Sequence, residues 1–152
     1  MIGLLQRVTS AQVTVGGELV GLIDKGIVVL VGVERGDEQG QADRLLERLL
    51  AYRIFPDERG RMNLSLQDIA GQLLLVPQFT LAADTSKGNR PGFQSAAAPA
   101  LAESLFSYLV DRAKRDFGMV QTGVFGADMQ VSLCNDGPVT FWLRAPPDAL
   151  GG

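Results

Sequence analysis

Two segments of the sequence combine apolar, strand-like runs with residues that could do chemistry. The first is Gln78-Phe79-Thr80, where an apolar run meets an amide and a hydroxyl. A threonine hydroxyl can act as a nucleophile when a neighbouring base removes its proton. The second is Gly137-Pro138, which opens the β-branched run 139–143. Glycine lets a ligand or a second chain come close to the backbone, and proline cannot donate to a β-ladder, so this pair could aim backbone carbonyls at a ligand.

The hexapeptide 135–140 also has a simpler interpretation, a tight turn before an edge strand. Its Asn, Asp, Gly and Pro residues are the usual residues of turns. Proline in a strand is confined to strand starts, edges and bulges, which is compatible with either interpretation. From the hexapeptide alone, the turn is the favoured one.

Thr80 is more readily interpreted as a positioning residue than as a nucleophile. Its activation would require a lysine, a carboxylate or an N-terminal amine, because the chain contains no histidine, and none of these lies nearby in sequence. An ordinary β-branched strand residue is the further alternative. The single cysteine, Cys134, is expected to be a small buried residue, because no imidazole is present to make it a thiolate.

The composition excludes much of enzyme chemistry. Without histidine there is no Ser-His-Asp relay and no histidine-ligated metal, and one cysteine can form neither an internal disulfide nor a thiolate zinc site. Neither a Walker loop nor a Gly-x-Gly-x-x-Gly segment is present. We therefore expect no metal and no cofactor, and catalysis by backbone dipoles, hydroxyls, carboxylates or groups of the substrate.

The length indicates a small domain, and the single cysteine, with no membrane span or signal peptide in the sequence, predicts that it is cytoplasmic. The 152 residues fit one domain with a real core, and no apolar run reaches the roughly 18–20 residues that span a bilayer. The N-terminus lacks the pattern of a signal peptide. The net charge of −3 argues against extensive wrapping of a nucleic acid but permits a small footprint.

Hydrophobic periodicity predicts a chain that alternates strands with two helices. Apolar residues of the segment 38–52 recur with helical spacing, and a second helix runs from about 97 to 117, where Gly118 ends it. A long irregular segment, 83–95, precedes it and is of the kind that is often functional. The predicted strands are 7–15, 18–23, 27–33, 62–66, 72–76 continuing through 77–81, 119–125, 129–134 and 138–143.

These elements predict one α+β domain over residues 1–145, followed by a loose tail, 146–152. We expect the two helices to cover one face of a mainly antiparallel, barrel-like sheet.

The two chemical segments resemble the paired signature motifs of the D-aminoacyl-tRNA deacylases, of the D-tyrosyl-tRNA(Tyr) deacylase type. The start 5–8, the loop 87–91 and the helix start 96–99 resemble that family too, so the likeness extends in order from residue 1 to about 145. One departure is visible, because Pro77 stands where the family often has serine. It removes a hydroxyl and a backbone N–H at that position.

The resemblance implies a homodimeric enzyme that hydrolyses the ester between a D-amino acid and the 3′ end of tRNA. It implies that the Gly137-Pro138 bond is cis and that each Gly-Pro pair reaches into the partner's active site. There its carbonyls would accept the α-ammonium and leave no room for an L side chain, so rejection works by exclusion. Glycine has no side chain to exclude, so glycyl-tRNA, including glycine mischarged on tRNA(Ala), would also be hydrolysed.

The resemblance also implies roles for individual residues. Backbone N–H groups near Phe79 and Thr80, next to Gln78, would polarise the ester carbonyl, and water assisted by the ribose 2′-OH would attack it. Arg7 would lie against the Gly-Pro pair, with a solvated strand arginine as the alternative. For Lys87 and Arg90, contact with tRNA phosphates is expected.

Two other functions remain open on the sequence. One is a non-catalytic dimeric module that binds a small amino acid or a nucleic-acid end. The other is a threonine or cysteine hydrolase of small esters, which the lack of an activating base disfavours.

Overall fold

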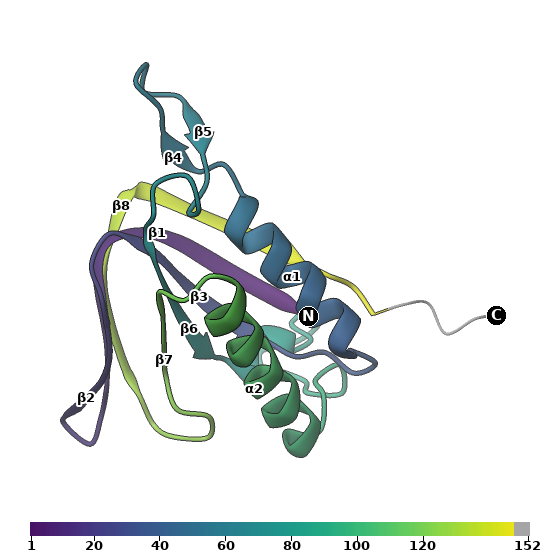
Figure 1. Cartoon of the computed structure of the whole chain (residues 1–152). Coiled ribbons are helices and arrows are strands. Elements are labelled where there is room, and N and C mark those ends of the chain that lie inside the picture. The colour runs from purple at the N-terminus through teal and green to yellow at the C-terminus, as the bar shows by residue number, and fades with distance from the viewer. Residues whose placement is uncertain (148–152) are drawn as a thin grey trace.

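The computed structural model describes residues 1–147, so most of the predicted tail, residues 148–152, lies outside the described residues. Strands β1 and β8 are long and lie side by side, and helices α1 and α2 lie next to each other (Figure 1). The elements, in chain order, are β1 (Ile2–Val15), β2 (Glu18–Ile23), β3 (Gly26–Gly32), α1 (Gln39–Ala51), β4 (Phe55–Pro56), β5 (Met62–Leu64), β6 (Gln72–Pro77), the 3₁₀ helix η1 (Phe79–Ala82), α2 (Pro99–Asp116), β7 (Val120–Thr122) and β8 (Gln130–Arg144).

The main sheet is mixed, whereas a mainly antiparallel sheet was expected. Its strands follow the order β2-β1-β3-β6-β7, and β8 pairs with β1. All three pairings of β1 are antiparallel, but β3, β6 and β7 run parallel to one another. The connections explain this difference. The chain passes from β3 to β6 through α1 and from β6 to β7 through α2, and such helical crossovers join parallel strands.

Both helices cover one face of this sheet, as predicted. The apolar stripe of α1, which includes Leu45 and Leu49, packs into one core with Leu105 and Leu109 of α2 and with the facing side chains of β3 and β6. Gly118 has a φ of +93°, and its N–H donates to Ala113 O (3.1 Å), which ends α2 near the expected position.

A second core lies on the opposite face of the sheet. It contains Val28 of β3 and Leu74 of β6, which alternate with the residues that face the helices. The strands bend around this core until β2 meets β7, where a side-chain carbon on Gly21 would lie 2.9 Å from Thr122 O. The sheet is therefore nearly barrel-shaped, as expected.

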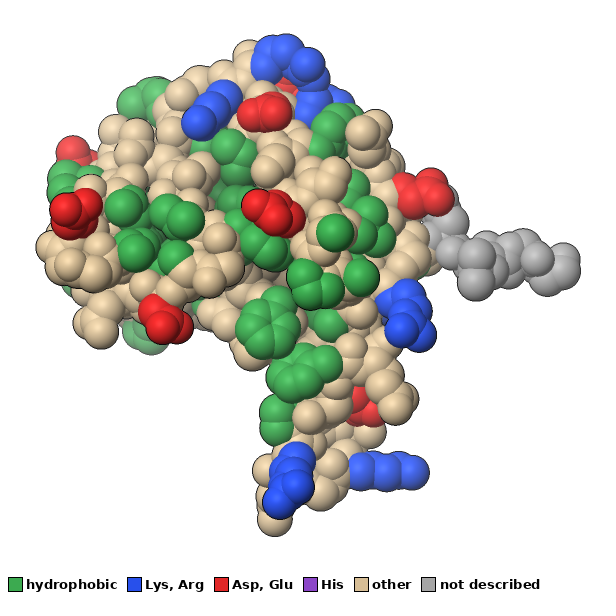
Figure 2. Space-filling view, turned by 90° about the horizontal axis from the view of Figure 1, so that it is seen from below, with side chains coloured by type: hydrophobic (Ala, Val, Ile, Leu, Met, Phe, Trp, Pro, Cys, Tyr) green, Lys and Arg blue, Asp and Glu red, His purple; other side chains and the backbone are tan. Residues whose placement is uncertain are grey.

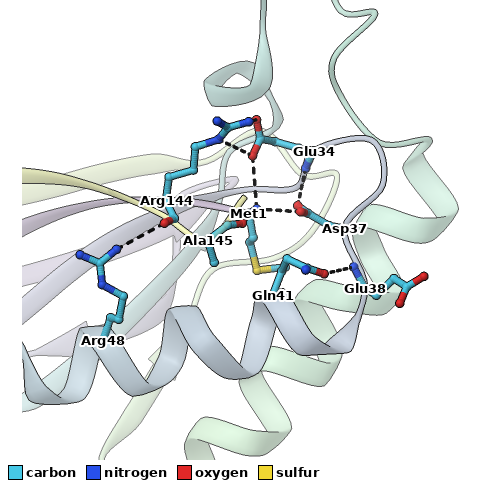
Figure 3. A network of polar contacts seen from close by, with 8 residues as sticks. All are labelled: Met1, Glu34, Asp37, Glu38, Gln41, Arg48, Arg144 and Ala145. Atoms are coloured by element: carbon cyan, nitrogen blue, oxygen red, sulfur yellow. Dashed lines mark hydrogen bonds and ion pairs between the residues drawn. The ribbon is translucent and has the colours of Figure 1, made fainter. Parts of the chain in front are cut away.

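A buried ion-pair network joins both ends of the described chain to this framework (Figure 3). Met1 is fully buried, and its ammonium donates to Glu34 Oε2 (3.3 Å), Asp37 Oδ1 (2.8 Å) and Ala145 O (2.5 Å). Arg144 holds the other side of Glu34 with two bonds of 2.9 Å. The start of β1, the segment before α1 and the end of β8 are thus fixed together.

The two carboxylates of this network respond differently to burial. Burial opposes the charge of Glu34, but hydrogen bonds from Arg144 and attraction to the Met1 ammonium outweigh it, so the pKa of Glu34 lies below its ordinary value. For Asp37, burial dominates over the bond from the ammonium, and its pKa is raised.

Candidate functional site

The Gln78-Phe79-Thr80 segment forms a tight turn at the end of β6. Gln78 N donates to Val31 O (2.8 Å) and extends the parallel pairing by one residue. The chain then enters η1, so the predicted continuation of the strand through Leu81 is wrong. Hydrogen bonding within the turn begins at Leu81 N, which donates to Gln78 O (3.2 Å). The first N–H groups of a helix have no partner inside it, and here they belong to Phe79 and Thr80.

The side chains of this turn face outward. Gln78 Nε2 donates to Thr80 Oγ1, so the partner of the hydroxyl is an amide rather than a base. Phe79 is 59% exposed and packs against Phe93, with ring centroids 5.3 Å apart. The geometry therefore favours the positioning interpretation of Thr80.

A cavity of about 500 Å³ opens beside Gln78 and Phe79. The beginning of α2 and the connection between β7 and β8 form its other walls, and Figure 2 shows hydrophobic side chains gathered on this side of the molecule. Phe125 and Met129 line it, and neither was expected from the sequence. They lie in a turn with no chemical motif, and only the return of the chain from β7 to β8 brings them to the site.

Gly137 and Pro138 lie in a loop that leaves β8 and returns to it. Gln6 pairs with Thr140 and Val8 with Asn135, so residues 136–139 stand opposite Arg7 alone. β8 is therefore one strand with a looped-out segment, and the predicted turn between two separate strands is wrong. Both flanks pair with β1, a relation that the hexapeptide itself cannot reveal. The Gly137–Pro138 peptide bond is cis.

Arg7 lies against this loop and is not a solvated strand residue. Its side chain is only 12% exposed. Nε donates to Asp136 O (3.0 Å), and Nη1 donates to Ile54 O (2.7 Å), just before β4. The guanidinium thus connects the loop to the base of the β4–β5 hairpin.

Asn135 and Thr140 close the loop at its base. Asn135 Oδ1 accepts the N–H of Val139 (3.1 Å), while its Nδ2 donates to Thr140 Oγ1 (2.9 Å). Gln6 Nε2 lies 3.4 Å from the same hydroxyl. Asn135 and Thr140 belong to the same motif, but the sequence alone predicts no role for either.

Lys87 and Arg90 are exposed in a second loop, which is closed by hydrogen bonds between Asp84 and Gly92 (2.7 and 3.0 Å). Hydrogen bonding by the Ser86 side chain, together with the Ser86 N–H that donates to Asp84 Oδ1 (2.9 Å), keeps the pKa of the Asp84 carboxyl below the ordinary value. Phe93 follows the loop and contacts Phe79, so the two cations lie on an extension of the Phe79 turn.

Within one chain, the Gly-Pro loop and the Phe79 turn lie toward opposite ends of the sheet. Arg7 pairs with Ile27, and Ile27 pairs with Leu73, at the start of β6. Gln78 lies five residues beyond Leu73, which is roughly 16 Å along a strand. The fold does not bring the two chemical segments together.

Comparison with known proteins identifies the chain. The family described as D-Tyr-tRNA(Tyr) deacylase matches residues 4–144, nearly the whole described structure. This chain belongs to that deacylase family. The resemblance predicted from the sequence is therefore confirmed, and so is the prediction of an ester-hydrolysing enzyme.

Curated relatives match the chain along almost its full length. The D-aminoacyl-tRNA deacylase of Nitrosococcus oceani is 62% identical over 147 residues, which are 97% of this chain and 95% of that one. The D-aminoacyl-tRNA deacylase of Thioalkalivibrio sulfidiphilus is 63% identical, with 97% and 99% covered, and that of Pseudomonas putida KT2440 is 61% identical, with 95% and 99% covered.

Two solved structures share the fold of this deacylase-family chain. A c-Myc DNA unwinding element binding protein superposes with a TM-score of 0.92 at 38% identity, over 96% of this chain and 99% of its own. A probable eukaryotic D-amino acid tRNA deacylase superposes with a TM-score of 0.79 over 95% and 98%. The second is only 17% identical, so it shows the shared fold alone.

The alternative of a cysteine nucleophile finds no support in the geometry. Cys134 is exposed on β8, which corrects the expectation of a buried thiol. Its neighbours Val131 and Leu133 face the second core, so the alternation of the strand turns Cys134 outward.

In the described part of the chain, no helix is long and apolar enough to cross a membrane.

Proposed function

We propose that this protein hydrolyses the ester bond between a D-amino acid and the 3′ end of tRNA, releasing the free amino acid and tRNA in the cytoplasm. The observation that carries the proposal is the deacylase-family match over residues 4–144, which includes intact Gln78-Phe79-Thr80 and Gly137-Pro138 segments. L-aminoacyl esters would be rejected, while glycyl-tRNA, including glycine mischarged on tRNA(Ala), would be accepted.

The N–H groups of Phe79 and Thr80 are proposed to stabilise the developing oxyanion. They stand at the start of η1, where they lack partners within the helix and can donate to an anion. Water assisted by the terminal ribose 2′-OH makes the attack. The Thr80 hydroxyl, which is held by Gln78, positions the ester and forms no covalent intermediate.

The cavity beside Phe79 is proposed to take the terminal adenosine of tRNA. The ester lies next to this nucleoside in the substrate, so a nucleoside site has to adjoin the N–H groups of Phe79 and Thr80. The cavity satisfies this requirement, and Phe125 and Met129 offer apolar surface to a base. Lys87 and Arg90 would meet phosphates further along the acceptor end.

Gly137 and Pro138 are proposed to act as a gate for substrate handedness in the active site of a partner subunit. Because the two segments lie roughly 16 Å apart along the sheet, one chain does not bring its Gly137-Pro138 loop to its own Phe79 turn. In a homodimer, the loop of each chain can reach the Phe79 turn of the other. The carbonyls of Gly137 and Pro138 would accept the α-ammonium and occupy the place of an L side chain.

The deciding experiment incubates the protein with matched D- and L-aminoacyl-tRNA and measures released amino acid. We expect hydrolysis of the D ester and of glycyl-tRNA, with the L ester intact. Hydrolysis of neither ester would favour a binding module, and equal hydrolysis of both would overturn the proposed gate. Sedimentation equilibrium measures the expected dimer independently.

Two further measurements examine the proposed chemistry. Thr80→Ala should keep substantial activity without an acyl adduct, because the backbone N–H groups remain. A trapped acyl group on Thr80 would instead identify a nucleophile. A tRNA that ends in 2′-deoxyadenosine should be hydrolysed much more slowly, and an unchanged rate would exclude assistance by the 2′-OH.

A further inference from the structure

We infer that Asn135 and Thr140 are positioning residues that set the selectivity of the Gly137-Pro138 loop. Within one chain they lie away from the Phe79 and Thr80 N–H groups that are proposed to hold the oxyanion. Their effect would pass through the backbone of the loop. This inference rests on the proposed function, because it assigns the loop the task of excluding L side chains.

The loop needs such support because the pairing with β1 is interrupted there. Between the pairs Gln6–Thr140 and Val8–Asn135, β8 has four residues and β1 only one. An N–H in an interrupted ladder loses its usual acceptor, and leaving it unpaired is costly. Asn135 Oδ1 replaces that acceptor for Val139 N, at 3.1 Å.

The two arms of the loop are held separately. On the first arm, Arg7 Nε donates to Asp136 O (3.0 Å). On the second arm, Val139 packs against the main core and its N–H is held by Asn135. Gly137 and Pro138 form the exposed tip between the two anchors.

Thr140 fixes the orientation of the Asn135 amide. Its hydroxyl accepts Asn135 Nδ2 at 2.9 Å, so the amide oxygen is turned toward Val139 N. Gln6 approaches the same hydroxyl from β1 at 3.4 Å, which connects the base of the loop to the sheet. The result is a short chain of side-chain bonds from β1 to the second arm.

Selectivity is the property that this arrangement should control most. A wall that works by exclusion has to stay in place, because a small displacement makes room for the unwanted side chain. The additional space does not raise the rate of hydrolysis of the D ester. Loosening the second arm should therefore raise the rate on L esters relative to D esters.

The test compares Asn135→Ala and Thr140→Val with the wild type by measuring kcat/KM on matched D- and L-aminoacyl-tRNA. Each variant should reduce the D/L ratio by about tenfold, the scale of one lost hydrogen bond in a site. Thr140→Ser keeps the hydroxyl and should keep the ratio. Ser132→Ala removes an exposed hydroxyl from the same strand outside the loop and serves as the matched control.

The outcomes separate this inference from the proposed function. A wild-type protein that hydrolyses neither ester contradicts the proposed function itself. A selective wild type whose Asn135→Ala and Thr140→Val variants lose activity equally on both esters, with an unchanged ratio, overturns the inference and indicates a merely structural role. If Asn135→Ala does not fold, Thr140→Val, which leaves the Asn135 acceptor for Val139 N in place and removes the hydroxyl that orients it, supplies the same comparison.

Discussion

At the scale of single residues, Gly137 occupies a position that no other residue can take without strain. Its φ is +131°, and a side-chain carbon there would lie 2.7 Å from Val139 Cγ2 and 3.1 Å from Arg7 Nη2. We predict that Gly137→Ala costs about 1–3 kcal/mol of stability and abolishes D-ester hydrolysis, since it displaces the loop. Thermal unfolding and deacylation assays measure the two effects.

The matched control for this change is Gly16→Ala. Gly16 also has a positive φ, but the space around it is open and it lies in the turn between β1 and β2. It should show a stability loss without loss of activity. Full deacylation by Gly137→Ala would mean that the conformation of the loop is irrelevant to the reaction.

At the scale of elements, the loop that carries Lys87 and Arg90 is closed at its base by hydrogen bonds between Asp84 and Gly92 and is exposed at its tip. We predict that Lys87→Ser and Arg90→Ser raise KM for aminoacyl-tRNA and leave kcat nearly unchanged. Each should also reduce the slope of log affinity against log salt by about 0.7–0.9, the share of one phosphate contact. Titrations at several salt concentrations measure this, and an unchanged slope would exclude the contact.

Helix α1 offers a test of how the framework is stabilised. Leu49 is 1% exposed and packs in the main core, so Leu49→Ala should lower the free energy of unfolding by about 2–5 kcal/mol. Glu47→Ala, on the exposed side of the same helix, should change it by less than about 0.5 kcal/mol. Urea unfolding of both variants measures the difference, and similar losses would mean that α1 is not held by its apolar stripe.

The elements also show which parts of the fold the sequence could predict. The helix expected at 38–52 is observed at Gln39–Ala51, because its apolar stripe reports the face that it buries. The turn at Phe79 was missed because Phe79 and Leu81 continue the apolar run of β6, although the chain has already turned away from the sheet. The loop in β8 uses the same residues as an ordinary turn, and only its pairing with β1 distinguishes the two.

Some residues of the candidate site could likewise be predicted from the sequence, and others could not. Arg7, Gln78 and Gly137 could be identified because they belong to motifs that are local in sequence. The cavity wall at Phe125 could not, because a turn between β7 and β8 supplies it and the arrangement of the strands brings it there.

At the scale of the whole molecule, Glu34 makes stability depend on pH. Its pKa in the fold lies below the ordinary value of 4.5, so its charge stabilises the native state above about pH 4.5. That contribution is lost as the pH falls through the lowered pKa. The wild type should therefore lose more stability than Glu34→Gln in urea unfolding as the pH is lowered from above the ordinary pKa of 4.5 to below the lowered pKa. Equal losses in both proteins would show that Glu34 does not contribute.

The buried ammonium of Met1 has a practical consequence for anyone who attaches a purification handle or a label. Residues placed ahead of Met1 would turn the ammonium into an uncharged amide with a single N–H, in a position with no exposed surface. Asp37 would lose the cation that it contacts, while Glu34 would keep Arg144, and breaking such a buried pair costs about 3–5 kcal/mol. A fusion at this end would therefore lower the stability of the protein.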